Sequence, residues 1–134
     1  MIDHHTALIY TMVLVSAADR DMTDAELRTI GEIVRYLPVF ADYDANKLTE
    51  AANGCAKLLG RESGLDEAFA MINKALPKKL HETAYALACD VAAAQRHISQ
   101  ETLQLLEFFR DELGIDRLAA AAIERGARAR HMTV

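Results

Sequence analysis

The sequence has little of the residue types on which turn-rich, disulfide-linked or disordered proteins depend. Its 134 residues include no tryptophan, two prolines, two cysteines and six glycines, and aromatic residues make up 6% of the chain. So few prolines and glycines argue against an all-β sandwich, which needs many turns. Hydrophobic residues make up 51% of the chain, which excludes a disordered tail and a small disulfide scaffold. Alanine and leucine dominate, as is typical of a helical domain.

The charge and the cysteines exclude further classes of protein. A net charge of -5 gives no electrostatic footprint for nucleic acid, so we expect no nucleic-acid partner. Cys55 and Cys89 each lie among alanines and leucines, which favours two small buried hydrophobic side chains, with a disulfide as the alternative. Low cysteine use and reduced thiols are consistent with a cytoplasmic location.

The longest apolar run, residues 7–18, predicts a buried helix. It is shorter than the roughly 20 residues that cross a bilayer, so we expect no transmembrane segment. It has some likeness to the apolar part of a signal peptide, but residues 1–5 before it contain no lysine or arginine.

Apolar periodicity and capping residues predict an all-α bundle of seven helices in one domain over residues 1–134. Thr23 and Glu26 have the spacing of a capping box, and Ser99 is a good N-cap. Pro38 and Gly114 are expected to end the helices before them, and the last helix is expected to fade through Gly126. The expected helices cover residues 2–18, 23–37, 42 or 44–60, 65–76, 77–94 and 99–113, and the last one starts at Asp116.

Part of the chain is repeated at an offset of 76 residues. Residues 17–23 align with residues 93–99, where Ala-Ala-x-Arg-x-(Met/Ile)-(Thr/Ser) occurs in both segments. The apolar periodicity of the following helices also stays in register. We therefore predict two related helix-turn-helix halves, about residues 7–39 and 83–115, which pack by pseudo-twofold symmetry around two apolar helices.

The turn of the first half is rich in carboxylates and is a candidate metal site. Asp19, Asp21, Asp24 and Glu26 occur within eight residues, and hard divalent cations require several oxygen ligands close together. The spacing is not that of an EF-hand, because Asp24 takes the place of that loop's glycine. The alternative is structural, since acids favour a first helical turn, Glu26 completes a capping box, and Asp19 and Asp21 can cap or face water.

The second half keeps few of these acids. Gln95, His97 and Thr102 are the counterparts of Asp19, Asp21 and Glu26, so a hard-cation site at the second turn alone is not expected. Asp90 lies in an otherwise apolar stretch, and a carboxylate buried there needs a partner. It either caps a helix or pairs with an arginine, or it faces the first turn and adds a metal ligand.

No catalytic constellation is evident, so we expect a protein that is not an enzyme. Ser16 has no evident base, and the chain lacks a nucleophile elbow and a phosphate-binding glycine loop. The five histidines have no zinc-binding spacing. The arginines of residues 125–131 are expected to be solvated at a helix C-terminus, with contact to an acidic partner as the alternative.

Residues 13–26, with the apolar face that follows them, resemble the TerB-like, tellurite-resistance family, and residues 89–99 continuing to Leu103 are a weaker copy. The resemblance implies a compact all-helical bacterial domain in stress-response complexes, either free in the cytoplasm or at the inner membrane face. It also implies metal binding through acids near the two turns, here Asp19, Glu26 and Asp90. The chain departs from the family where Arg20 and Arg96 replace the usual glycine of each turn, and where Gln95 replaces the leading acid.

Two hypotheses follow from the sequence. In the first, a helical module binds Ca²⁺, Mg²⁺ or Mn²⁺ weakly through Asp19, Asp21 and Glu26, with Asp90 as a further candidate ligand. In the second, a metal-free interaction domain uses its apolar helix faces to contact a partner protein or a second copy of itself.

Overall fold

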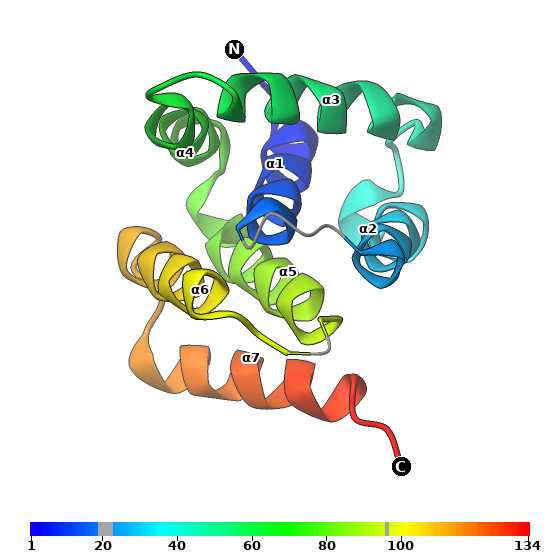
Figure 1. Ribbon diagram of the computed structural model, residues 1–134, viewed down its shortest axis with the longest axis vertical. Helices are drawn as coiled ribbons and strands as arrows, with labels where there is room; N and C mark the ends of the chain where they lie inside the picture. The colour runs from blue at the N-terminus through cyan, green and yellow to red at the C-terminus, as the bar shows by residue number, and fades with distance from the viewer. Residues whose placement is uncertain (19–22, 96) are drawn as a thin grey trace.

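The structure is a computed structural model that describes residues 1–18, 23–95 and 97–134. Over these residues the protein is all-α, without a strand, which confirms the predicted seven-helix bundle (Figure 1). The α-helices are α1 (His4–Ala17), α2 (Asp24–Tyr36), α3 (Leu48–Leu59), α4 (Gly64–Ala75), α5 (His81–Ala93), α6 (Gln100–Glu112) and α7 (Arg117–Arg130). Three short 3-10 helices, η1 (Pro38–Phe40), η2 (Ala45–Lys47) and η3 (Lys78–Leu80), lie in the connections.

Helices α1 and α5 form the centre of the bundle. Every residue of α1 from 7 to 16 is buried, because the helix is apolar on nearly all sides and packs against α2, α3, α4, α5 and α6. Helix α5 crosses α1, and its small side chains Ala84, Ala88 and Ala92 allow close packing. The outer helices bury only one stripe each. Helix α2, for example, buries Glu26, Ile30 and Val34.

The helices of the two halves occur at corresponding positions. The bounds of α2, moved by the repeat offset of 76 residues, coincide with those of α6, and α1 and α5 also end at corresponding residues. Helix α3 packs on α1, and α7 packs on α5. In Figure 1 the pairs α2 and α6, and α3 and α7, lie on opposite sides of the central helices. Helix α4, which packs on α1 and α3, has no counterpart in the second half.

Helix ends follow the predicted signals in most places. Thr23, Ser99 and Asp116 each accept a hydrogen bond from a backbone N–H of the first turn. Gly114 follows α6 with a φ of 64°, a left-handed conformation that favours glycine. The expected fading of α7 at Gly126 is wrong, because the helix continues to Arg130. Ala120 and Ala127 are buried on this helix, which packs on α5, and such packing outweighs the helix propensity that one glycine loses.

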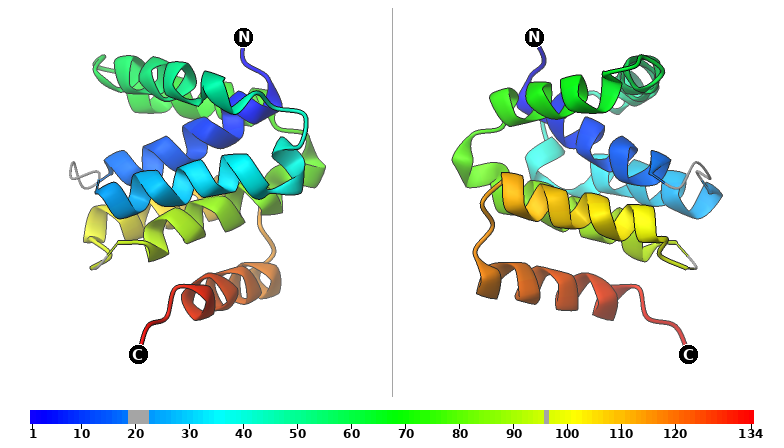
Figure 2. Two further views of the ribbon diagram at one scale, coloured as in Figure 1. Left: turned by 90° about the vertical axis from the view of Figure 1, so that its right-hand side faces the viewer. Right: turned by 60° about the vertical axis from the view of Figure 1, so that its left-hand side comes forward.

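The N-terminus and the C-terminus lie at opposite ends of the molecule in all three ribbon views (Figures 1 and 2). None of the helices in the described segments is long and apolar enough to cross a membrane.

Two glycines give a matched test of the packing between α3 and α4. A Cβ on Gly64, at the start of α4, would lie 2.0 Å from the carbonyl oxygen of Leu58, whereas a Cβ on Gly31 would meet nothing within 4 Å. We expect Gly64→Ala to destabilise the protein by about 1–3 kcal/mol, since backbone must move. Gly31→Ala, in the interior of α2, should stabilise it by about 0.5–1 kcal/mol.

Urea unfolding of both variants measures these changes. A Gly64→Ala variant as stable as the parent protein would show that α3 and α4 are not in such close contact.

Candidate functional site

Glu26 is one of two acids that the structure describes at the first turn, and it is fully buried. It lies in the first turn of α2 with a relative exposure of 0%. Asp19 and Asp21, the other predicted ligands of this turn, lie outside the described residues, as does Arg20. Asp24 is exposed in the same helical turn. As expected for an acid near a helix N-terminus, its negative charge interacts favourably with the helix dipole.

Two hydroxyl groups hold the carboxylate of Glu26. Ser16 Oγ, from the last turn of α1, donates to Glu26 Oε2 at 2.5 Å, and Thr23 Oγ1 donates to Oε1 at 3.2 Å. Thr23 Oγ1 also accepts from the backbone N–H of Glu26 at 3.2 Å, as the predicted N-cap requires. The carboxylate thus accepts from one hydroxyl of α1 and from the hydroxyl of the residue that caps α2.

In the second half, the buried residue that corresponds to Glu26 carries no charge. Thr102, the counterpart of Glu26, is also fully buried, and its hydroxyl lies 2.9 Å from that of Ser99. The counterpart of Ser16 is Ala92, which is also buried. A polar side chain at this buried position is therefore common to both halves, but only in the first half is it a carboxylate, and there it has two hydroxyl-bearing partners, Ser16 and Thr23.

Asp90 pairs with an arginine, one of the two alternatives left by the sequence. Arg130 Nη2 at the end of α7 donates to Asp90 Oδ1 at 2.7 Å, and His131 Nε2 lies 3.6 Å from the same oxygen. The Asp90 side chain is only 17% exposed, so a partner is expected for its charge. The ion pair attaches the end of α7 to α5.

The described side chains do not by themselves assemble a metal site. Within residues 1–18, 23–95 and 97–134, no group of three or more His, Cys, Asp or Glu side chains is placed to hold a metal ion. Of the predicted ligands, Glu26 and Asp90 are described: Glu26 is bonded by Ser16 and Thr23, and Asp90 is paired with Arg130. Asp19 and Asp21 stay predictions.

His5 has a structural environment that the sequence did not indicate. It is 7% exposed, and its Nε2 lies 2.9 Å from the carbonyl oxygen of Val39 and 3.2 Å from Asp42 Oδ1. Its ring also packs against Phe40 and Tyr43. This cluster fixes the connection after α2 against the start of α1, so His5 has a packing role.

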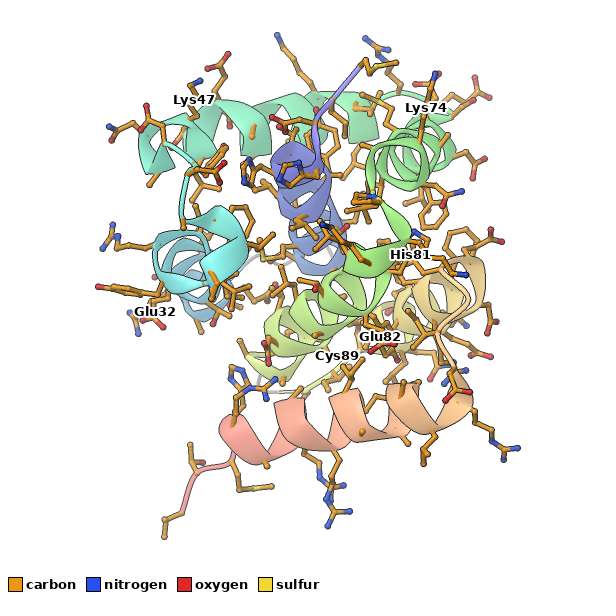
Figure 3. The ribbon with its side chains drawn as sticks, turned by 180° about the vertical axis from the view of Figure 1, so that it is seen from behind. Glu32, Lys47, Lys74, His81, Glu82 and Cys89 are labelled. Atoms are coloured by element: carbon orange, nitrogen blue, oxygen red, sulfur yellow. The ribbon has the colours of Figure 1, made fainter. Side chains whose placement is uncertain are left out.

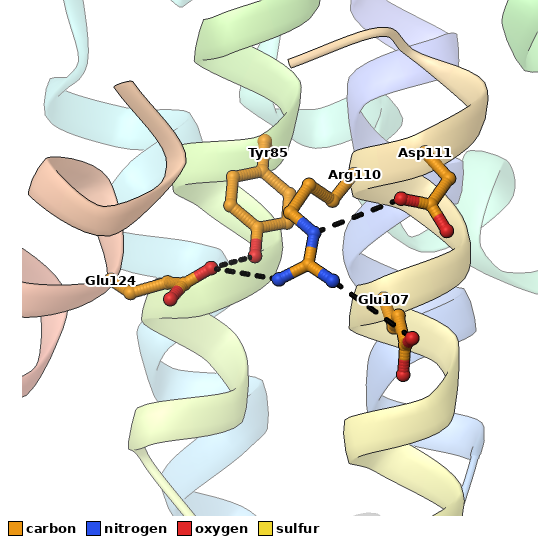
Figure 4. Close-up of polar contacts among 5 residues, drawn as sticks. All are labelled: Tyr85, Glu107, Arg110, Asp111 and Glu124. Carbon is orange, nitrogen blue, oxygen red and sulfur yellow. Dashed lines mark hydrogen bonds and ion pairs between the residues drawn. The ribbon is translucent and has the colours of Figure 1, made fainter. Parts of the chain in front are cut away.

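A polar network joins α5, α6 and α7 (Figure 4). Tyr85 donates its hydroxyl hydrogen to Glu124 Oε2 at 2.5 Å, and Arg110 Nη1 lies 3.8 Å from the same carboxylate oxygen. Burial, together with the bond to Glu124, raises the pKa of Tyr85. Arg110 also lies within 4 Å of Glu107 and Asp111. These residues are far apart in sequence, and neither a motif nor the repeat indicated that they meet.

A cavity of about 580 Å³ lies beside this network, between α5, α6 and α7. Tyr85, Arg110 and Glu124 contribute to its lining, and so does Gln95 from the turn after α5. In the sequence Gln95 stands out only as the counterpart of Asp19, and the cavity is not predicted from it. A glutamine in an alanine-rich segment is the one signal that could have drawn attention to it.

Both cysteines are free and buried, as predicted for small hydrophobic side chains. Cys89 lies on α5 toward α7 (Figure 3). Cys55 lies in α3, with its sulfur near the backbone carbonyl oxygen of Tyr10. Burial raises the pKa of each thiol to about 12.

Comparisons with protein-family models, with curated proteins and with solved structures found no match. The site is therefore interpreted from the chemistry of this chain.

The residues that differ between the halves give a test of the hydrogen bond between Ser16 and Glu26. Ser16→Ala removes a hydroxyl donor from a buried carboxylate and should destabilise the protein by about 1–3 kcal/mol. The double variant Ser16→Ala/Glu26→Thr reproduces Ala92 and Thr102 of the second half, so it should recover most of that loss. Denaturant unfolding of both single variants and the double variant measures the coupling. Additive effects would mean that the two side chains do not depend on each other.

The buried thiols predict a pH dependence of stability. In the folded protein burial raises their pKa to about 12, above the ordinary value of 9.0, so folding favours the protonated form. The resulting stability is fully present below about pH 9 and is lost as the pH rises from 9 towards 12, by about 1.4 kcal/mol per pH unit for each thiol. A Cys55→Ala/Cys89→Ala variant should therefore lose stability less steeply over pH 9–11 in urea unfolding. Parallel curves for the two proteins would contradict the thiol assignment.

Proposed function

We propose that this chain is a non-enzymatic helical module of the TerB-like, tellurite-resistance type that binds a divalent cation at the turn between α1 and α2. The observation that supports the proposal is the fully buried carboxylate of Glu26 at the end of this turn. Asp19 and Asp21 precede it in the sequence, so three carboxylates are available within eight residues.

The physical argument concerns the cost of burying charge. A carboxylate removed from water is stable only if hydrogen bonds or an opposite charge compensate the lost solvation. Glu26 accepts bonds from two hydroxyls, and in the described part of the chain no lysine, arginine or histidine lies within ion-pair distance of it. A divalent cation bound by Glu26, Asp19 and Asp21 would supply the compensating charge through the oxygen ligands that such ions prefer.

Ser16 and Thr23 have a positioning role in this proposal. Each hydroxyl binds a different oxygen of Glu26, which limits rotation of the carboxylate. Asp90 is the least suited of the candidate ligands, because it would have to leave its 2.7 Å pair with Arg130. We therefore assign the cation to Glu26, Asp19 and Asp21, and leave Asp90 as a ligand only if that pair opens.

A second function, a metal-free interaction domain, is supported by the apolar surface around α6. Leu103 and Phe108 of α6, Ile98 before it and Leu65 of α4 are each exposed by 39–48%. Ile98 and Leu103 line the hollow between α5, α6 and α7, and Leu65 and Phe108 line a separate hollow beside α4 and α6. Exposed apolar surface of this kind often marks a protein-binding site. This alternative predicts that cations do not bind, so the titration below distinguishes the two.

Isothermal titration of metal-stripped protein with Ca²⁺, Mg²⁺ and Mn²⁺ tests the cation proposal. We expect saturable binding of at least one ion, weaker by tenfold or more in Asp19→Asn and in Ser16→Ala/Glu26→Thr. Glu101→Gln is the matched control, because Glu101 is an exposed acid in the first turn of α6, and its loss should leave binding unchanged.

Absence of saturable binding by the parent protein would reject the proposal. Binding that survives Ser16→Ala/Glu26→Thr in a folded protein would move the ion away from Glu26.

A further inference from the structure

A pocket of about 670 Å³ lies beside the first half of α1, where α3 crosses this helix (Figure 1). Its volume lies within the roughly 300–1,000 Å³ of typical ligand pockets. Three segments line it, namely the start of α1, the connection that contains η2, and α3. The lining combines aromatic rings, from Tyr10 and Tyr43, with the carboxylates of Asp3, Asp44 and Glu50.

The hydroxyl of Tyr10 is an unpartnered polar group in this pocket. Tyr10 is 7% exposed, and its Oη has no hydrogen-bond partner among the described residues. The atom is still open to solvent, because in the described part of the chain the side-chain polar atoms that are both closed off and unbonded belong to Gln95. A buried tyrosine usually bonds through its hydroxyl, so Tyr10 offers a free hydrogen-bonding group to a molecule in the pocket.

Gly54 of α3 leaves room beside this hydroxyl. A Cβ on Gly54 would lie 3.2 Å from Tyr10 Oη, so a side chain here would crowd the hydroxyl. Glycine is unfavourable in the interior of a helix. Its presence at this position keeps the pocket open as far as the Tyr10 hydroxyl.

The pocket has an excess of negative charge. Asp3 and Asp44 each use Oδ1 to accept a hydrogen bond from a backbone N–H of the following turn. Neither of them, nor Glu50, has an ion-pair partner within 4 Å in the described segments. Lys47 also lines the pocket, so three unpaired carboxylates are balanced there by one lysine.

Tyr43 lies close to these same three carboxylates. Burial, together with their negative charges, raises the pKa of the Tyr43 hydroxyl. Its ring packs against that of His5 with the ring centroids 5.1 Å apart. His5 is itself 3.2 Å from the carboxylate of Asp42, so this fourth acid of the lining already has a partner. The pocket therefore offers carboxylates and an aromatic ring to a positively charged ligand, which both groups attract.

The placement of the acids favours an extended organic cation over a metal ion. Within residues 1–18, 23–95 and 97–134, no three His, Cys, Asp or Glu side chains are placed to hold one metal ion. An aliphatic polyamine carries several positive charges separated by methylene segments, so it can pair with carboxylates that are spread over a pocket. Its ammonium groups also donate hydrogen bonds, as that of a lysine does.

We propose that this pocket binds an aliphatic polyamine. One ammonium group donates a hydrogen bond to the Tyr10 hydroxyl, and the methylene chain lies along the rings of Tyr10 and Tyr43. The carboxylates of Asp3, Asp44 and Glu50 compensate the positive charges. The pocket lies at the other end of α1 from the turn that precedes α2, and it does not depend on the proposal of a divalent cation at that turn.

Titration calorimetry of the full chain with spermidine as the probe tests this inference. We expect saturable binding that weakens as salt is added, because salt screens the attraction between charges. Putrescine, with two positive charges, and butylamine, with one, should bind successively more weakly, by about two- to fivefold for each charge lost.

Two substitutions test the role of the Tyr10 hydroxyl. Tyr10→Phe keeps the ring, so in urea unfolding it should be at least as stable as the parent protein. It should bind spermidine about tenfold more weakly, because a hydrogen bond from a charged donor is lost. Gly54→Ala, which places a methyl group beside the hydroxyl, should also weaken binding. Tyr36→Phe is the matched control, since Tyr36 is 76% exposed on α2 and lies outside the pocket, and its binding should be unchanged.

The triple variant Asp3→Asn/Asp44→Asn/Glu50→Gln tests the role of the acids. Asparagine caps helices as well as aspartate does, so the variant should fold, as urea unfolding can verify. Its affinity for spermidine should fall by about tenfold or more, because each lost ion pair weakens binding by about two- to fivefold.

A second triple variant controls for net charge. Glu32→Gln/Glu62→Gln/Glu82→Gln removes as many charges from exposed positions outside the pocket, and it should bind spermidine like the parent protein. Absence of saturable spermidine binding by the parent protein would overturn the proposal, as would equal losses in the two triple variants.

Unchanged affinity in Tyr10→Phe would overturn the role of the hydroxyl. Titration of Tyr10→Phe with divalent cations should match that of the parent protein, so the polyamine proposal and the cation proposal succeed or fail separately.

Discussion

Helices α1 and α5 are apolar on so many sides that neither can exist in water unless other helices enclose it. Helix α1 is buried along ten consecutive residues, and the small side chains of α5 lie against it. The other helices need bury only one stripe each, so their outer faces are free to vary. The acidic turn lies where the central helix α1 ends and α2 begins, whereas the cavity lies along the central helix α5, between α6 and α7.

Hydrophobic periodicity was sufficient to predict the helices, because each apolar stripe reflects which face packs inward. Thr23, Ser99 and Gly114 marked helix ends correctly since capping depends on neighbouring backbone groups. The prediction failed at Gly126, where propensity favours an end to the helix but packing of Ala120 and Ala127 maintains it. Local signals therefore described the helix starts better than the end of a well-packed helix.

The candidate site was only partly predictable for a related reason. Sequence spacing placed Glu26 in a capping box, but only the packing of α1 on α2 shows that Ser16 binds its carboxylate. Asp90 and Arg130 are 40 residues apart, and the sequence left the choice of arginine open. The network of Tyr85, Arg110 and Glu124, like the cavity beside it, arises where three helices meet, and no spacing within one helix encodes such a meeting.

The two halves share a helix pair but differ in the polar side chains that occupy equivalent positions. Glu26 and Asp19 of the first half correspond to Thr102 and Gln95 of the second, so carboxylates have given way to a hydroxyl and an amide. In the second half, the hydroxyls of Ser99 and Thr102 lie within hydrogen-bond distance of each other, and neither side chain carries a charge. The shared scaffold thus accommodates a carboxylate in one half and a hydroxyl in the other at the same buried position.

The opposite placement of the two termini has a consequence for engineering this fold. Domains whose ends lie close together usually tolerate circular permutation with a short linker. Here a linker joining the original ends would have to run along the whole bundle (Figures 1 and 2). The same geometry suits the domain to serial fusion, because proteins attached at its two ends would be held apart by the length of the bundle.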